Sequence, residues 1–185
     1  MAVQSTMLAL GTQAPPFQLM DTASGKAVTL ADFAGSRAVL VAFICNHCPY
    51  VKHILDGFVS FAREYGPRGL AVVAISSNDV STYPADAPAE MTRLARARGF
   101  TFPYLYDESQ AVARAYDAAC TPDFFLFDAA RKLVYRGQFD GSRPGGSQPV
   151  TGADMRAASE AVLGGRPVPE KQIASVGCGI KWKAS

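Results

Sequence analysis

The chain has 185 residues, of which 49% are hydrophobic and 18% charged, and its net charge is +2. This length and composition predict one soluble globular domain over residues 1–185, with a core that needs no disulfides. The weak, scattered charge excludes a protein built to bind nucleic acid or an anionic membrane. No window reaches the ~18 apolar residues of a membrane span, and no basic residue precedes the apolar stretch at the N-terminus as in a signal peptide. We therefore expect a cytoplasmic protein, or a periplasmic one if a signal has been removed.

The first half of the chain predicts a hairpin, a buried strand and an amphipathic helix. Residues 17–30 form the hairpin around a glycine turn, and 30–35 form a short helical turn. Residues 38–44 (AVLVAFI) have no polar face, which is typical of a central strand covered on both sides. The spacing of apolar residues over 49–65 then predicts a helix with one buried stripe, ending at Gly66.

The second half continues the alternation of strands and helices. The expected elements are a strand at 69–77, a helix at 88–99, a strand at 102–107, a helix at 108–118, strands at 123–128 and 133–140, and a helix at 153–165. Prolines and glycines after this point predict an irregular tail over 165–185 that packs along the surface. The order indicates the α/β class, with a mixed central sheet and helices on both faces. The core spans about 11–164.

Two cysteines mark the point where the buried strand passes into the first long helix, in Cys45-Asn46-His47-Cys48. A helix N-terminus offers unpaired N–H groups and a positive dipole end, which stabilise a thiolate. Pro49 fits the first helical turn, where its missing N–H costs nothing. His47 supplies a positive charge or a hydrogen bond to Cys45. We therefore expect an exposed nucleophile at Cys45 and a sheltered partner at Cys48.

Two other interpretations of this segment remain open. The cysteines could be buried thiols without a chemical role. A zinc site needs about four ligands, which Cys45, Cys48, one histidine (His47 or His53) and a distant cysteine could supply. The chain has no second C-x-x-C, so we expect neither a metal nor another cofactor, and His53 is expected to be structural.

A second segment, CTPDFFLFD at residues 120–128, places Thr121-Pro122 directly before an apolar strand. Proline is tolerated at the first position of a strand.

Cys120 is expected to be a buried small hydrophobe. Cys178 lies between two glycines in the tail and has two interpretations: a small filler in the tail, or a candidate resolving cysteine that reaches the active site.

The segments FICNHCPY and TPDFFLFD together resemble the thioredoxin fold, in its alkyl-hydroperoxide-reductase/thiol-specific-antioxidant (peroxiredoxin-like) branch. The resemblance is to a subgroup with the motif C-N-H-C-P-Y-V. It implies a cis Pro122 that faces the C-x-x-C, with Thr121 binding substrate backbone beside Cys45. Cys48 aligns with the peroxidatic cysteine of peroxiredoxins, and Cys45 stands where those enzymes have Thr or Ser.

The resulting hypothesis is a thiol–disulfide oxidoreductase in which Cys45 attacks and Cys48 resolves. Its partners would be a protein or small-molecule disulfide or dithiol and a thiol electron donor; the oligomeric state stays open. The alternative is a thiol peroxidase in which Cys48 attacks a hydroperoxide and Cys45 or Cys178 condenses with the sulfenic acid. Arg114 and Arg136 are then the candidates for the activating arginine. A third interpretation is a non-enzymatic metal- or partner-binding module on the same fold.

Overall fold

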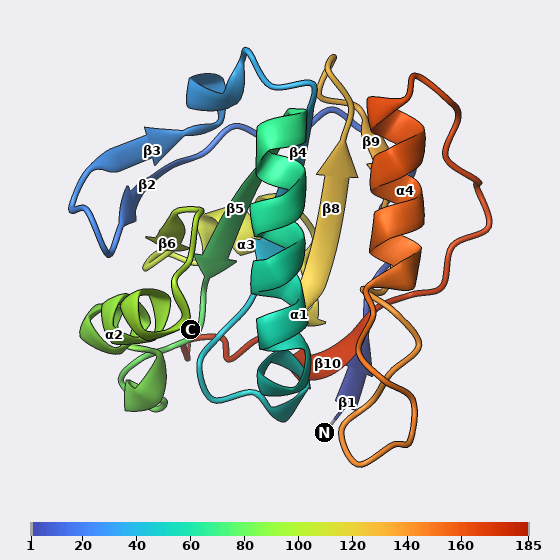
Figure 1. Cartoon of the computed structure of the whole chain (residues 1–185). Helices are drawn as coiled ribbons and strands as arrows, with labels where there is room; N and C mark the ends of the chain where they lie inside the picture. The colour runs from blue at the N-terminus through green and yellow to red at the C-terminus, as the bar shows by residue number, and fades with distance from the viewer. Residues whose placement is uncertain (1, 185) are drawn as a thin grey trace.

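The computed structural model describes residues 2–184 and centres on a seven-stranded mixed sheet (Figure 1). The strand order is β3-β2-β6-β5-β4-β8-β9. The strands are β2 (Gln18–Asp21), β3 (Ala27–Thr29), β4 (Ala38–Phe43), β5 (Leu70–Ser76), β6 (Tyr104–Tyr106), β8 (Asp123–Phe127) and β9 (Leu133–Tyr135). β4 runs parallel to β5, as β5 does to β6, whereas β8 pairs antiparallel with the other edge of β4. The predicted mixed sheet and the N-terminal hairpin of β2 and β3 are confirmed.

Helices cover both faces of this sheet. The helices α1 (Pro49–Tyr65), α2 (Pro88–Arg98) and α4 (Ala153–Leu163) contribute to the core on one face, and α3 (Ala111–Ala115) packs on the other (Figure 1). Short 3₁₀ turns lie at Leu30–Phe33, Gly66–Arg68 and Pro84–Asp86. The α/β class is therefore confirmed. No helix within residues 2–184 is long and apolar enough to cross a membrane.

Strand β4 contributes side chains to the hydrophobic clusters on both faces of the sheet, because successive side chains of a strand point to opposite faces. Leu40 and its alternate neighbours belong to the cluster under α1, whereas Val41 and its alternate neighbours belong to the cluster under α3. All six residues of β4 are at most 1% exposed. This two-sided burial explains the apolar run in the sequence and fixes the end of β4 firmly in place.

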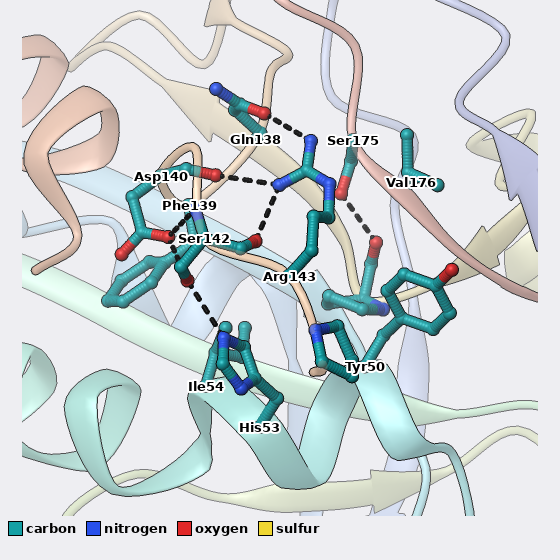
Figure 2. Close-up of a pocket in the computed structure, with 12 residues that line it drawn as sticks. Tyr50, His53, Ile54, Gln138, Phe139, Asp140, Ser142, Arg143, Ser175 and Val176 are labelled. Carbon is teal, nitrogen blue, oxygen red and sulfur yellow. Dashed lines mark hydrogen bonds between the residues drawn. The ribbon is translucent and has the colours of Figure 1, made fainter. Parts of the chain in front are cut away.

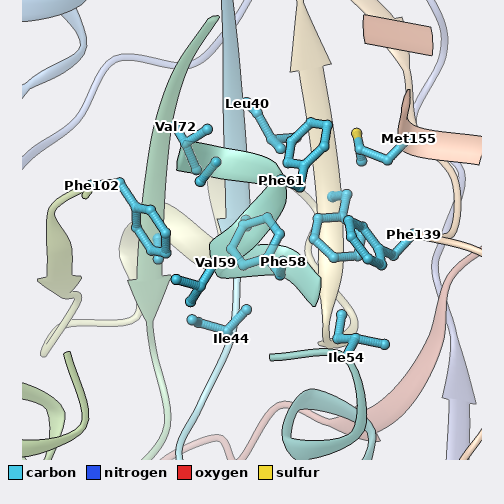
Figure 3. Packing of buried hydrophobic residues seen from close by; sticks show 14 of the residues in the cluster. Leu40, Ile44, Ile54, Phe58, Val59, Phe61, Val72, Phe102, Phe139 and Met155 are labelled. Carbon is cyan, nitrogen blue, oxygen red and sulfur yellow. The ribbon is translucent and has the colours of Figure 1, made fainter. Parts of the chain in front are cut away.

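The buried stripe of α1 holds that helix against the sheet. Phe58 and Phe61 are fully buried, and both contact the ring of Phe139 (Figure 3). Truncating such a buried ring to alanine costs about 3–5 kcal/mol. Because the stripe runs the length of the helix, the first turn of α1 is held in a fixed position at the end of β4.

The expectation of an irregular tail is wrong. Residues Val176–Gly179 form β10, which lies between β1 (Ala2–Gln4) and β7 (Cys120–Thr121) in a separate antiparallel sheet of three strands. Two glycines in a four-residue strand remove the alternating apolar pattern that marks strands in a sequence. Backbone hydrogen bonds to neighbours on both sides stabilise β10 instead.

Two further elements are shorter than predicted. The strand expected over 133–140 ends at Tyr135, because the next N–H groups bond to the tail: Arg136 donates to Gln172 Oε1 and Gln138 donates to the carbonyl of Ile173. The helix expected over 108–118 is confined to α3. Left-handed residues stand on both sides of it, Gln110 with a φ of 63° and Asp117 with a φ of 51°.

A buried ion pair ties the N-terminal segment to β8. Arg136 and Asp123 are 1% and 0% exposed, and their Nη2 and Oδ2 atoms lie 3.4 Å apart. Ser5 joins the pair, donating to Asp123 Oδ1 at 2.8 Å and accepting from Arg136 Nε at 2.9 Å. Burial raises the pKa of the Asp123 carboxyl, and the neighbouring guanidinium opposes that rise. Removing one partner therefore leaves a buried charge without compensation.

Replacing Arg136 with alanine should lower the free energy of unfolding by about 3–5 kcal/mol, because Asp123 would stay buried without its cation. Urea denaturation at neutral pH measures the change. Arg98→Ala is the matched control: it breaks the exposed pair with Asp56 and should cost about 1 kcal/mol or less. Equal losses in the two variants would contradict this role of the buried pair.

Candidate active site

The two cysteines of the C-x-x-C lie where β4 ends and α1 begins, as the sequence predicts. Cys48 is the N-cap residue of α1, and Pro49 occupies its first turn. All four cysteines of the chain are free thiols. Cys45 and Cys48 are both fully buried, so the expectation of an exposed nucleophile at Cys45 is wrong. Both sulfurs lie against Thr121, the residue before Pro122.

The Thr121–Pro122 bond is cis, as predicted, and Thr121 contacts both sulfurs. Its side-chain oxygen lies 3.3 Å from Cys45 Sγ, and its carbonyl oxygen lies 3.1 Å from Cys48 Sγ. The sheet explains this proximity, because β8, which follows Pro122, pairs directly with β4, which precedes Cys45. The predicted meeting of the two motifs is therefore confirmed.

The site favours the thiolate on Cys48. Hydrogen bonding from the Cys45 side chain is the main cause that lowers the pKa of Cys48 to about 4. Donors from Cys178 and the backbone N–H of Val51 add to this effect, while burial opposes it. The Thr121 carbonyl favours the protonated form, but it is one acceptor against several donors. Hydrogen bonds to the charged form of a thiol stabilise that form.

Cys45 has the opposite character. Its hydrogen bond to Cys48, its burial and the negative charge of Asp86 raise its pKa, and the Thr121 hydroxyl only partly offsets them. Cys45 is therefore the thiol that donates to the Cys48 thiolate. The thiolate that the site favours is thus on Cys48, whereas the sequence predicted the nucleophile at Cys45.

Asp86 organises the loop between the cysteines. The carboxylate is fully buried, and its Oδ1 accepts the backbone N–H groups of Asn46 at 2.8 Å and His47 at 3.1 Å. Its Oδ2 accepts from His47 Nδ1 at 2.6 Å and from Asn78 Nδ2 at 2.9 Å. Tyr104 adds a hydrogen bond to the side chain of Asn46. Sequence reasoning missed Asp86, because nothing in the loop after β5 indicates that it folds back under the cysteines.

His47 lies near Cys45, although its closest partner is another residue. Its Nδ1 is 3.8 Å from Cys45 Sγ but only 2.6 Å from Asp86 Oδ2. The imidazole also stacks on the ring of Tyr83, with centroids 4.8 Å apart. The predicted proximity to Cys45 is thus present, and Asp86 fixes the orientation of the ring.

Cys45, His47 and Asp86 place one donor atom each within 4.8 Å of one another, which is the spacing of a metal site. Both carboxylate oxygens of Asp86, however, already hold the loop through hydrogen bonds from three residues. A structural zinc centre needs four ligands. The contacts of Asp86 therefore fit a carboxylate that positions the loop better than they fit a metal ligand.

The remaining two cysteines differ in position. Cys120 is fully buried, and burial raises its pKa, which agrees with the prediction of a small hydrophobe. Cys178 is half-buried in β10, where its side chain and N–H both interact with Cys48. The tail therefore does bring this cysteine to Cys48.

The predicted open substrate edge at Thr121 is not present. The backbone of Thr121 is paired with Cys178 of β10, so the chain's own tail occupies the place expected for substrate backbone. The candidate activating arginines are also engaged elsewhere. Arg136 belongs to the buried pair with Asp123, and the guanidinium of Arg114 lies 4.4 Å from the ring centroid of Trp182.

A polar recess lies on the other side of Pro122 (Figure 2). Arg143 projects into it and donates to Gln138 Oε1 at 2.6 Å and to the carbonyl of Ser142 at 2.7 Å. His53, from the second turn of α1, is hydrogen-bonded to Ser142 Oγ at 3.0 Å. That bond fits the structural role predicted for His53 and ties the 141–152 loop to the helix that carries Cys48.

Solved structures similar to this chain share its fold over most or all of its length. An uncharacterized conserved protein from Geobacillus kaustophilus is 55% identical with a TM-score of 0.97, over 100% of this chain and 97% of that one. A hypothetical protein from Sinorhizobium meliloti 1021 is 52% identical with a TM-score of 0.97, over 98% and 99% of the two chains. A thiol:disulfide interchange protein of the thioredoxin family from Chlorobium tepidum TLS is 19% identical with a TM-score of 0.64, over 84% and 99%. The fold is therefore thioredoxin-like.

Comparison at the sequence level identifies the family. A search of curated proteins finds no match to this chain. The sequence profile of the AhpC/TSA family matches residues 10–136, a segment that contains the C-x-x-C, Asp86 and Pro122. The match spans more than half of the chain, and the chain therefore belongs to the AhpC/TSA family.

Proposed function

We propose that the protein is a thiol–disulfide oxidoreductase in which Cys48 is the attacking sulfur. The observation that carries this proposal is the asymmetry of the pair: a Cys48 thiolate at the N-terminus of α1 receives a hydrogen bond from a protonated Cys45. A thiolate is the form of cysteine that attacks disulfides. Family membership supports a thiol-based redox function, and the C-N-H-C-P-Y-V segment supports placement in the subgroup with that motif.

The exchange takes two steps. The Cys48 thiolate attacks one sulfur of a substrate disulfide, forms a mixed disulfide and releases the first substrate thiolate. Cys45 then attacks Cys48, forms the Cys45–Cys48 disulfide and releases the second sulfur, which takes the proton of Cys45. Two electrons pass from the protein pair to the substrate, and a thiol electron donor returns them by the reverse exchange.

The first step also prepares the second. Cys48 loses its negative charge when it enters the mixed disulfide, and with it the main cause of the raised pKa of Cys45. The Thr121 hydroxyl, 3.3 Å from Cys45 Sγ, remains to stabilise the new thiolate. Burial and the charge of Asp86 still raise the pKa of Cys45, so the Cys45 proton passes to the departing second sulfur as Cys45 attacks.

Peroxidase activity has less support. The position three residues before Cys48, where peroxiredoxins have Thr or Ser, holds Cys45, whose side chain donates to Cys48. The two arginines considered for activation of a hydroperoxide contact Asp123 and Trp182 instead. Consumption of a hydroperoxide, measured beside disulfide exchange, separates the two functions.

Replacing Cys48 with serine should reduce the exchange rate about 1,000-fold or more, since the attacking thiolate is removed. The assay follows reduction of glutathione disulfide with dithiothreitol as the electron donor. Cys120→Ser, at a buried cysteine outside the pair, should keep the wild-type rate. Full activity in the Cys48 variant would contradict the assignment.

The thiolate absorbance at 240 nm should titrate with a midpoint of about 4 in the reduced protein. The folded-state pKa of Cys48 is lowered from 9.0, so the thiolate persists above this midpoint and is lost as the pH falls through it. The transition should disappear in Cys48→Ser and remain in Cys120→Ser. A single transition near the ordinary cysteine value would show that the site does not stabilise the thiolate.

Replacing Asp86 with alanine should slow exchange by about 10–100-fold, because the N–H groups of Asn46 and His47 lose their acceptor and the loop moves. Asp86→Asn should restore part of the rate, since an amide oxygen still accepts those bonds. Asp79→Ala, at a half-buried aspartate of the same loop whose side chain, among the described residues, bonds only Ser81 and Thr82, is the control and should have little effect. The role of Asp86 would be refuted by a wild-type rate in the alanine variant.

A further inference from the structure

Strand β10 brings a third sulfur to the carbonyl group that contacts the redox pair. Cys178 stands opposite Thr121 in the antiparallel pairing of β10 with β7. The Thr121 carbonyl oxygen is 3.1 Å from Cys48 Sγ, and the side chain and N–H of Cys178 both interact with that sulfur. Cys48 therefore lies between two thiol donors, Cys45 on the loop and Cys178 on the tail.

The glycine before Cys178 makes this approach possible. A Cβ atom at Gly177 would lie 1.9 Å from the carbonyl oxygen of Thr121 and 3.0 Å from the nitrogen of Pro122. Both neighbours are backbone atoms, which a side-chain rotation cannot move. Any larger residue would push β10 away from β7 and Cys178 away from Cys48.

The tail is anchored on both sides of Cys178. Before it, Ser175 Oγ donates to the carbonyl of Pro122 at 2.7 Å. After it, Ile180 donates to the carbonyl of Ala119 at 3.1 Å and Lys181 donates to Asn78 Oδ1 at 2.8 Å. The strand is thus part of the folded site, and it uses the edge of β7 that an extended substrate would otherwise pair with.

Access to the three sulfurs is unequal. Cys45 and Cys48 are fully buried, whereas Cys178 is half-buried. In thiol–disulfide exchange the sulfur that is attacked depends on access and on the leaving group. An external thiol or disulfide therefore meets Cys178 first.

We infer that Cys178 is the sulfur through which the buried pair exchanges electrons with external disulfides and thiols. The disulfide that Cys48 attacks is then one carried by Cys178. This inference rests on the proposed function and specifies the immediate substrate of Cys48.

The relay has three balanced steps. The Cys178 sulfur attacks an external disulfide, and the external sulfur that leaves takes the proton of the Cys178 thiol. Cys48 attacks the Cys178 sulfur of this mixed disulfide, which forms the Cys48–Cys178 bond and expels the second external sulfur. Cys45 attacks Cys48, and Cys178 leaves and takes the proton of Cys45. Two electrons have then moved from Cys45 and Cys48 to the external disulfide.

Reduction of the protein disulfide by an external thiol should also pass through Cys178. An external thiolate attacks the accessible Cys178 sulfur of the Cys48–Cys178 disulfide and expels Cys48. A thiol of low pKa leaves faster, and the pKa of Cys48 is lowered to about 4, whereas burial and the interaction with Cys48 raise that of Cys178 to about 11. Attack at Cys178 thus combines the accessible sulfur with the better leaving group.

The test is peptide mapping of the full-length reduced chain after one equivalent of glutathione disulfide, acid quenching and alkylation. Cys45→Ser should accumulate a Cys48–Cys178 disulfide, and Cys48→Ser should carry glutathione on Cys178. Cys178→Ser should form the Cys45–Cys48 disulfide about tenfold or more slowly than the wild type. Cys120→Ser is the control and should oxidise at the wild-type rate.

Two results would overturn the inference: Cys178 that stays fully alkylatable in every variant, or Cys178→Ser that oxidises at the wild-type rate. If instead Cys48→Ser and Cys45→Ser both retain normal turnover, the proposed function itself fails. The two failures are therefore distinguishable.

A second variant tests the geometry without altering a cysteine. In the Cys45→Ser background, Gly177→Ala should abolish the Cys48–Cys178 disulfide and speed alkylation of Cys178. Gly179→Ala is the matched control, because its Cβ would meet only the side chain of Val3, at 3.3 Å. Equal yields of the disulfide in the two alanine variants would contradict the seating of β10 against Thr121.

Discussion

The close approach of three segments at Thr121 is the constraint on which the site depends. The hydroxyl of Thr121 faces Cys45, its carbonyl faces Cys48, and its backbone pairs with Cys178. One residue before a cis-proline thus holds the start of α1 and the tail strand together. The two-sided burial of β4 holds the end of that strand in place, and the apolar stripe of α1 holds the first turn of the helix beside it.

The donors and charges around the two sulfurs shift the pKa values of Cys45 and Cys48 in opposite directions, although the two side chains are chemically identical. The donors around Cys48 favour its thiolate, and that thiolate together with Asp86 favours the protonated form of Cys45. Because each pKa depends on the charge of its neighbour, exchange at one sulfur changes the reactivity of the next. The order of the exchange steps therefore follows from the charges on the sulfurs.

The sequence predicted what local patterns encode. The apolar run of β4, the spacing in α1, the C-x-x-C at their junction and the proline before β8 all lie as expected. It missed what depends on contacts between distant segments: Asp86 under the cysteine loop, and β10, whose glycines fit a space shaped by Thr121 and Pro122. It also placed the thiolate on Cys45 and not on Cys48, since a helix N-terminus suggests a thiolate without revealing which sulfur receives the donors.

Every disulfide that forms among Cys45, Cys48 and Cys178 should include Cys48. A crystal structure of the chain after stoichiometric oxidation tests it most directly. The expected result is a bond from Cys48 to Cys45, or from Cys48 to Cys178. A Cys45–Cys178 bond, or an external thiol attached to Cys45 beside a free Cys48, would contradict it.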